Sequence, residues 1–205
     1  MLTDFWEKKE YPPKVIAMNE AVASLWAEGR DLASLTVSEI TSRAGIGKGT
    51  AYEYFSSKEE IIATALEYDL QKQLEQLAVI EEQATGFRDI LEKLMDWLKE
   101  NFHNNSIFTL VFRQDATVKK ISGELGKEHC NLKKNSRAIK GMIGQVLLIG
   151  ENEGIIKKQN PYFGSVALIS QLLSFSLYLV QPDETDVTID EAKEFAVESI
   201  IKMLN

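Results

Sequence analysis

The amino-acid sequence predicts an all-α protein with a small N-terminal domain and a larger C-terminal helical bundle. Apolar residues recur at intervals of three and four along most of the 205-residue chain, as the buried face of a helix requires. No stretch of useful length alternates β-branched and polar residues in the manner of a half-buried strand. The prolines stand where helices are expected to start or stop, at Pro12, Pro13, Pro161 and Pro182.

The expected helices follow one another with clear boundaries. A first helix opens after Pro12-Pro13 and ends at Gly29. The others, in chain order, are two short helices between Thr36 and Phe55, a long helix over 58–83, a helix over 87–101, a central helix that stops at Gly154, and two last helices over 163–180 and 189–204. These eight are the helices with recognisable boundaries, and we expect about nine in the whole chain.

Four start signals define these boundaries further. In a capping box, a hydroxyl at the N-cap and a carboxylate three residues later satisfy two backbone N–H groups. The pattern occurs three times, in Thr36-Val-Ser-Glu39, Ser57-Lys-Glu-Glu60 and Thr188-Ile-Asp-Glu191. Asn160-Pro161 supplies the fourth signal, with an amide at the N-cap and proline at the first helical position.

The charge balance limits the classes of partner. The chain carries 31 acidic and 23 basic residues and a formal charge of −8. This balance argues against a protein that coats nucleic acid or an anionic membrane, so a nucleic-acid site must be local.

Metal, cofactor and catalytic chemistry have little support in the sequence. Cys130 is the single cysteine, and His103 and His129 lack partners at metal-ligand spacing. No Ser/His/Asp set or carboxylate pair stands in a recognisable catalytic setting. We expect no metal, no cofactor and no enzyme activity, and a cytoplasmic location because no signal segment precedes the first helix.

One apolar segment raises the question of a membrane. Residues 162–180 contain no charged side chain and are long enough to cross a bilayer. Glycine, serine and glutamine residues dilute their apolar character. We therefore expect a helix buried in a soluble core or dimer, and no membrane contact.

Residues 36–58, TVSEITSRAGIGKGTAYEYFSSK, have the pattern of a helix-turn-helix. Gly45 can adopt the left-handed conformation that ends one short helix, and a second short helix then starts at Lys48. The second helix of such a pair fits the major groove of DNA. Its cation, hydroxyl and phenol groups suit phosphates and base edges, and Lys58 is placed to hold a flanking phosphate. The alternative for this segment is a helical hairpin that only packs.

The same segment resembles the DNA-binding domain of the TetR family of bacterial repressors. The resemblance covers roughly residues 15–62 and rests on the matches Ala27-Glu28-Gly29, Thr36-Val37, Ile40, Arg43-Ala44-Gly45, Lys48-Gly49-Thr50, Tyr52, Phe55 and Lys58-Glu59-Glu60-Ile61. It implies that Thr36, Tyr52 and Lys58 contact backbone phosphate, while Ile40 and Phe55 are core. The full set expected at the DNA is Thr36, Arg43, Lys48, Gly49, Thr50, Tyr52, Glu53, Tyr54 and Lys58.

Four residues of the segment depart from the family pattern, two of them being Thr41, where alanine is usual, and Tyr54, where histidine is frequent. Gly47 replaces the helix-capping serine common there, and Glu53 places a negative charge in the recognition helix. The Glu53 carboxylate either accepts a hydrogen bond from cytosine or remains solvated.

For the rest of the chain, the resemblance implies a helical bundle that encloses an effector pocket and forms a four-helix dimer interface. Helices 163–180 and 188–204 supply apolar faces suited to a homodimer. Bulky side chains of the middle helices either fill the core or line the pocket: Trp97, Phe102, His103, Phe108, Phe112, Met142, Phe175 and Tyr178.

Two basic segments are each open to two interpretations. Residues 119–140 hold seven basic side chains, which form either a solvated face or an entrance for an anionic effector. The arm with Lys8, Lys9 and Lys14 is either a frayed terminus or an added phosphate contact.

The sequence thus predicts a DNA-binding domain over 1–57 and a ligand-binding and dimerisation domain over 58–205. The function expected is that of a homodimeric transcriptional regulator, a repressor that a small-molecule effector releases from a palindromic operator in double-stranded DNA. The alternative is a helical small-molecule sensor or carrier that acts through protein contacts, and an enzyme comes third.

Overall fold

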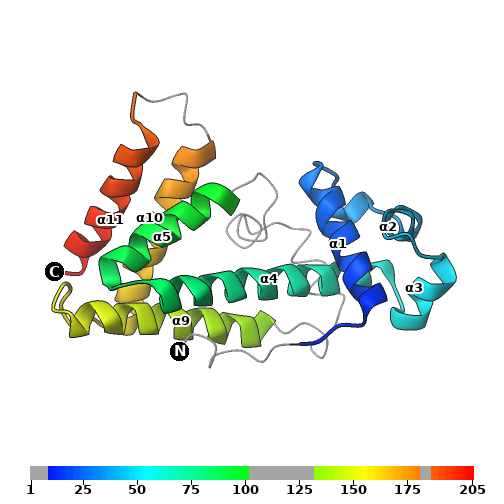
Figure 1. The fold of residues 1–205 in the computed structure, drawn as a ribbon, viewed down its shortest axis with the longest axis horizontal. Helices are drawn as coiled ribbons and strands as arrows, with labels where there is room; N and C mark the ends of the chain where they lie inside the picture. The colour runs from blue at the N-terminus through cyan, green and yellow to red at the C-terminus, as the bar shows by residue number, and fades with distance from the viewer. Residues whose placement is uncertain (1–8, 102–131, 181–185) are drawn as a thin grey trace. The chain divides into compact units, whose positions relative to one another are not determined.

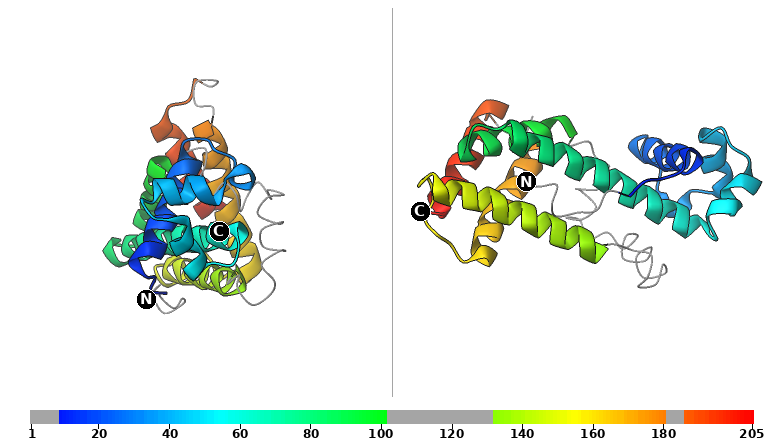
Figure 2. Two further views of the ribbon diagram at one scale, coloured as in Figure 1. Left: turned by 90° about the vertical axis from the view of Figure 1, so that its right-hand side faces the viewer. Right: turned by 60° about the horizontal axis from the view of Figure 1, so that its bottom comes forward.

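The computed structural model describes residues 9–101, 132–180 and 186–205, and all of its regular structure is helical (Figure 1). Within these ranges there is no strand, as the further views in Figure 2 also show, so the all-α expectation is confirmed. The elements are α1 (Pro13–Ala27), the 3-10 helix η2 (Leu32–Ser34), α2 (Val37–Arg43), α3 (Lys48–Tyr54), α4 (Lys58–Gln83), α5 (Phe87–Asn101), α9 (Leu132–Asn152), α10 (Pro161–Val180) and α11 (Ile189–Met203).

Most of the expected helix boundaries are confirmed. Both α4 and α5 span the residues that apolar spacing predicts. The glycines expected to stop helices have positive φ angles, 84° at Gly29, 68° at Gly45 and 71° at Gly154. Left-handed backbone of this kind favours glycine, which has no Cβ to clash with the chain.

Three of the four helix-start signals have the expected contacts. Thr36 and Thr188 both form complete capping boxes with the glutamate three residues on. The Asn160 side chain accepts a hydrogen bond from the backbone N–H of Tyr162 at 2.9 Å.

The start of α4 differs in one contact. The hydroxyl of Ser57 accepts a hydrogen bond from the N–H of Glu60 at 3.1 Å, as predicted. The Glu60 carboxylate accepts instead from the backbone N–H and the hydroxyl of Ser56, both at 2.7 Å. Ser56 offers two donors at once, its backbone N–H and its hydroxyl. The Glu60 carboxylate therefore binds Ser56, one residue before the N-cap Ser57 that it would bind in a capping box.

The chain divides into two compact units, and the division falls within α4 between Leu74 and Glu75. The first unit contains α1, η2, α2, α3 and the first part of α4. The second contains the end of α4 with α5, α10, α11 and most of α9.

In the second unit α10 packs along α11, and both pack against α5 (Figure 1). Phe87, Met95, Val197 and Ile200 are almost completely buried there. A Cβ added at Gly150 would lie 2.8 Å from the Phe87 ring, so glycine is what allows α9 to approach α5 so closely.

Polar contacts join α5 to α11 at the surface of the same unit. Arg88 pairs with Glu198, and the Lys193 ammonium lies 2.7 Å from the Asp96 carboxylate. Both pairs are partly solvated, so they favour one alignment of the two helices more than they add stability.

Among the described helices, α10 is long and apolar enough to cross a membrane, although the core helix of a soluble protein passes the same test. Only 28% of its most apolar window is buried within the chain. Its large exposed apolar side chains are Tyr162, Phe163, Val166, Leu177 and Val180.

Candidate nucleic-acid interface

One apolar cluster holds the helix-turn-helix together. Met18, Val22 and Leu25 of α1 pack with Ile40 of α2, and all four are at most 4% exposed. The same cluster takes in the following residues of α3 and α4: Ala51, Phe55, Ile61, Ile62 and Ala65. Ala51 and Phe55 anchor α3 to this cluster. The side chains on the opposite face of α3 therefore point toward solvent.

The turn between α2 and α3 is closed by backbone hydrogen bonds. The Ile46 N–H donates to the carbonyl of Thr41 at 3.0 Å, and Gly45, in the left-handed conformation, donates to Ser42 at 3.3 Å. Gly47 is the N-cap of α3 and offers no side-chain cap. The first N–H groups of α3 are therefore free of the serine cap that the family pattern would supply.

The outward face of α3 presents varied donors in a short span. Tyr52 is 58% exposed and Tyr54 is 40% exposed, which is unusual for aromatic side chains of a packed domain. Lys48 and Glu53 are exposed beside them, and Thr50 is half-buried. A Cβ added at Gly49 would have no atom of the chain within 4 Å, so no packing contact requires glycine at that position.

Thr36 and Lys58, expected at phosphates, also have partners inside the chain. The Thr36 hydroxyl donates to a carboxylate oxygen of Glu39 at 2.8 Å and accepts from the Glu39 N–H at 3.2 Å. The Lys58 ammonium donates to the carbonyl of Ala33 at 2.7 Å. Lys58 thereby ties the linker before α2 to the first turn of α4.

That linker contains a helical turn that apolar spacing does not predict. The carboxylate of Asp31 accepts from the N–H groups of Ala33 and Ser34 at 3.3 and 3.1 Å, which starts η2. Leu32 of this turn is buried in the apolar cluster. The signal for such a turn is an aspartate whose side chain can accept hydrogen bonds from the backbone N–H groups two and three residues later.

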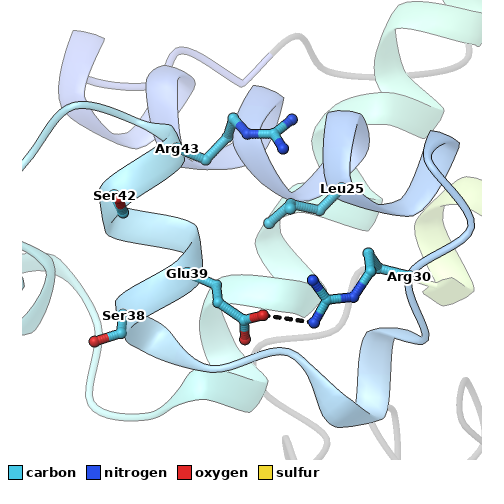
Figure 3. A pocket seen from close by; sticks show the side chains of 6 residues that line it. All are labelled: Leu25, Arg30, Ser38, Glu39, Ser42 and Arg43. Atoms are coloured by element: carbon cyan, nitrogen blue, oxygen red, sulfur yellow. Dashed lines mark hydrogen bonds and ion pairs between the residues drawn. The ribbon is translucent and has the colours of Figure 1, made fainter.

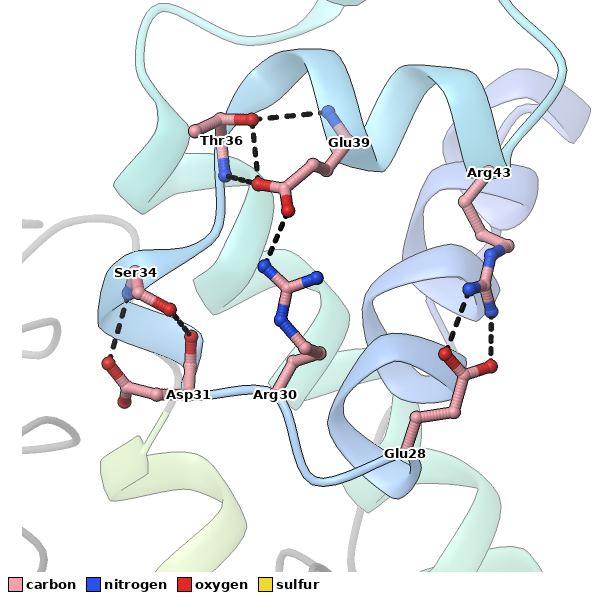
Figure 4. A network of polar contacts seen from close by, with 7 residues as sticks. All are labelled: Glu28, Arg30, Asp31, Ser34, Thr36, Glu39 and Arg43. Carbon is pink, nitrogen blue, oxygen red and sulfur yellow. Dashed lines mark hydrogen bonds and ion pairs between the residues drawn. The ribbon is translucent and has the colours of Figure 1, made fainter.

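Arg43, also expected at the DNA, is engaged at both terminal nitrogens (Figure 4). Nη1 donates to an oxygen of Glu28 at 2.6 Å and to the Ser24 hydroxyl at 2.6 Å, and Nη2 donates to the other Glu28 oxygen at 2.9 Å. These contacts lower the pKa of Glu28 and raise the pKa of Arg43.

A second arginine, Arg30, pairs with Glu39 at 2.5 Å (Figure 4). Hydrogen bonds from Thr36 and then from Arg30 lower the Glu39 pKa to about 2. Between the two ion pairs lies an open groove of about 650 Å³ (Figure 3). Its lining residues are Leu25, Arg30, Ser38, Glu39, Ser42 and Arg43.

The N-terminal arm is bound to α4 at Lys9. The Lys9 backbone N–H and carbonyl both bond the side-chain amide of Gln71 at 3.3 Å, and its ammonium lies 3.1 Å from Glu67. Lys9 is therefore paired with a carboxylate of its own chain. Lys8 lies outside the described residues.

Half of the residues expected at an effector pocket lie in the described part of the second unit. Trp97, Met142 and Phe175 are buried, and Tyr178 stacks on Phe175 with ring centroids 6.2 Å apart. The Trp97 indole donates to Gln76 at 2.8 Å and the Tyr178 hydroxyl to the carbonyl of Val187 at 2.9 Å. The other four fall outside the described residues: Phe102, His103, Phe108 and Phe112.

Comparison with known proteins identifies the first unit. Residues 21–65 match the family model described as bacterial regulatory proteins, tetR family. Over these residues the helix-turn-helix is similar to that of tetR-family regulators. The match runs from the middle of α1 into α4 and so includes all of α2 and α3.

Two curated relatives are regulators that carry the same type of domain. The chain is 23% identical over 181 residues to YerO of Bacillus subtilis, named an uncharacterized HTH-type transcriptional regulator, and this covers 83% of the chain and 58% of the relative. It is 29% identical over 63 residues to the similarly named YxbF, covering 31% and 17%. The matched part of the chain thus spans about half the length of YerO and less of YxbF.

Solved structures extend the likeness to the whole fold. They include the regulator FadR of Bacillus subtilis in complex with stearoyl-CoA, with a TM-score of 0.61, 16% identity and coverage of 93% and 99%. FadR of Bacillus halodurans, a fatty acid degradation regulator, has a TM-score of 0.65, 16% identity and coverage of 96% and 97%. A TetR transcription regulator of Haloarcula marismortui has a TM-score of 0.64, 18% identity and coverage of 93% and 96%. At these identities the likeness establishes a TetR-like fold.

Proposed function

We propose that this protein is a DNA-binding transcriptional regulator, a homodimeric repressor that a small-molecule effector releases from a palindromic operator. The observation that carries the proposal is the exposed face of α3. Two solvent-exposed tyrosines stand beside Lys48 on a short helix that Ala51 and Phe55 fix to the core. A hairpin that only packs has no reason to expose such side chains together.

In this proposal α3 lies in the major groove. Thr50 and Tyr54 reach base edges, Lys48 at the start of α3 meets a backbone phosphate, and Gly49 allows the helix backbone to approach the DNA closely. Thr36, Tyr52 and Lys58 hold flanking phosphates, and Glu53 faces the groove as an acceptor for cytosine or as a solvated carboxylate. Arg43 is already held by Glu28 and is not one of these DNA contacts.

The dimer forms through α10 and α11. The apolar side chains that α10 exposes continue on α11 with Phe195 and Met203, which are both more than half exposed. A second copy of the same face buries them in a four-helix bundle. The dimer then presents two α3 helices to half-sites about 34–36 Å apart, or a small multiple of a helical turn. This pairing, rather than a membrane, accounts for the uncharged α10, and the protein acts in the cytoplasm.

The effector binds in the domain formed by residues 58–205, while residues 1–57 bind DNA. Trp97, Met142 and Phe175 are buried apolar and aromatic side chains of this domain, and Tyr178 stacks on Phe175, so an acyl chain that inserts among them meets a lining of matching polarity. Because one structural relative holds stearoyl-CoA, a long-chain acyl-CoA is the first effector class to test. Effector binding tilts α4 and alters the separation of the two α3 helices, with a coupling of about 1–3 kcal/mol.

Operator selection tests the DNA-binding part of this proposal. Full-length protein is used to select duplexes from a random library, and its affinity for the selected duplex is measured at several salt concentrations. We expect a palindromic site, with affinity that falls as salt rises. Binding without sequence preference, or without a salt dependence, contradicts the proposal and favours a sensor or carrier that acts through protein contacts.

Substitutions separate phosphate contacts from base contacts on the selected duplex. Lys58→Ala should weaken binding to all duplexes by a similar factor, because a phosphate contact carries no sequence information. Thr50→Ala and Tyr54→Ala should also change which bases are preferred. Lys72→Ala on the exposed side of α4 is the matched control and should leave DNA affinity unchanged. Unchanged affinity for Lys58→Ala at every salt concentration contradicts the phosphate assignment.

A further inference from the structure

Two ion pairs join α2 to the segment that comprises the end of α1 and the linker after it (Figure 4). Each of the two partners supplies one acidic and one basic side chain. Before α2 the order along the chain is Glu28 and then Arg30, whereas on α2 it is Glu39 and then Arg43. Glu28 pairs with Arg43, and Arg30 pairs with Glu39. The seven-residue helix α2 is therefore held at both ends by contacts of opposite polarity.

This alternation distinguishes one register of α2 from its neighbours. Glu39 and Arg43 lie one helical turn apart, about 5–6 Å along the same face. If α2 slid by one turn, Arg43 would face Arg30, or Glu39 would face Glu28. Like charges would then oppose each other, so only the observed register satisfies both pairs.

The geometry of Arg43 supports a structural role more than contact with DNA. Its guanidinium grips the Glu28 carboxylate with two parallel hydrogen bonds, the arrangement that gives arginine–carboxylate pairs their directional preference. The Ser24 hydroxyl takes a third bond from the same guanidinium. A phosphate would have to displace both partners before it could bind these nitrogens.

We propose that the Glu28–Arg43 and Arg30–Glu39 pairs form a register lock that positions α2, and through the Gly45–Gly47 turn α3, without contact between Arg43 and DNA. This inference rests on the proposed DNA-binding function. Arg43 is then a positioning residue for operator recognition. The apolar core supplies most of the stability of the domain. The exposed ion pairs favour the observed register of α2 over neighbouring registers.

Salt dependence separates this role from a phosphate contact. Affinity for the selected operator is measured at several salt concentrations for wild type, Arg43→Gln, Glu28→Gln, Arg43→Glu and the double variant Glu28→Arg/Arg43→Glu. Lys48→Gln serves as the comparison that removes a cation from α3. Circular dichroism and thermal unfolding establish that each variant is folded.

The register lock predicts that Arg43→Gln and Glu28→Gln weaken binding to a similar extent, about threefold, with the wild-type salt slope. Arg43→Glu should weaken it further, because it places two carboxylates together, and adding Glu28→Arg should recover most of that loss. Lys48→Gln should reduce the salt slope by about one per subunit.

Three results overturn the inference. They are a reduced salt slope for Arg43→Gln, tighter binding for Glu28→Gln, and no recovery in the double variant. The first two mean that Arg43 contacts phosphate and that Glu28 competes with the DNA for it. Absence of specific binding by the wild type itself contradicts the proposed function instead, so the two failures are distinguishable.

Discussion

Glu39 combines two tasks in one side chain. It closes the capping box at the start of α2 through the N–H and hydroxyl of Thr36, and it receives the guanidinium of Arg30. These donors stabilise the charged carboxylate, which is why its pKa falls to about 2 although the side chain is near the surface.

The pH dependence of stability should reveal this carboxylate. The pKa of Glu39 is lower in the folded state than its ordinary value of 4.5, so its charge stabilises the fold above about pH 4.5, and the contribution is lost as pH falls toward about 2. Glu39→Gln keeps hydrogen-bonding capacity but has no charge to titrate. We expect its melting temperature to be below that of wild type at pH 7 and the difference to shrink between pH 4.5 and 2.

Glu191→Gln is the matched control for this measurement. Glu191 closes the capping box at the start of α11, and hydrogen bonds from Thr188 lower its pKa. No arginine contributes to that shift. The pH-dependent change in melting temperature should therefore be smaller for Glu191→Gln than for Glu39→Gln. Equal changes in the two variants would contradict the contribution of Arg30.

Sequence patterns identified some of these residue roles and missed others. The Thr36–Glu39 capping box is local, so three-residue spacing was enough to predict it. The partners of Arg43 and Lys58 are 15 and 25 residues away in the chain. Only the folded arrangement decides that an arginine expected at phosphate meets Glu28, because any surface carboxylate is an equally good partner on sequence grounds.

At the scale of elements, the turn between α2 and α3 depends on backbone conformation more than on packing. Gly45 has a φ angle of 68°, and a Cβ there would have no atom within 4 Å. Strain of the left-handed backbone is therefore the main cost of any side chain at this position.

Replacing this glycine tests that view. Gly45→Ala should lower the free energy of unfolding by about 1 kcal/mol, measured by urea denaturation. Gly49→Ala is the matched control, since its helical backbone suits alanine and its Cβ also enters open space. It should raise stability by roughly 0.5 kcal/mol. A loss of stability in Gly49→Ala would contradict the assignment of open space around α3.

The long helices were predictable because repeated apolar spacing and strong end signals agree. The span of α4 and the stop at Gly154 follow directly from such signals. The short turn η2 was not predicted, since three residues are too few to show a helical period. Its signal is Asp31 and the buried Leu32, and burial of that leucine becomes evident only in the folded unit.

At the scale of the whole molecule, α10 and α11 carry large apolar side chains that the described part of the chain leaves exposed. Leu177 is the most exposed of these side chains, at 73%. Leaving it in water is unfavourable, whereas a symmetric partner removes it from water together with its neighbours.

Leu177→Asp should therefore convert the protein to monomers in sedimentation experiments and reduce operator affinity, because a monomer contacts only one half-site. Leu148→Asp is the matched control, since Leu148 is 46% exposed on α9, outside the surface assigned to the dimer. Dimers that persist in Leu177→Asp would contradict the assigned interface. Monomers that bind the full operator as tightly as wild type would contradict the need for two half-sites.

The carboxylates that hold Arg30 and Arg43 have a consequence for the living cell. The guanidiniums of Arg30 and Arg43 are neutralised within the chain, so less positive charge remains around α2 to attract random DNA. A chromosome offers millions of nonspecific sites that compete for a regulator. For a regulator of the kind proposed, weak binding to those sites leaves a larger share of the molecules free, so that fewer copies per cell are needed to keep one operator occupied.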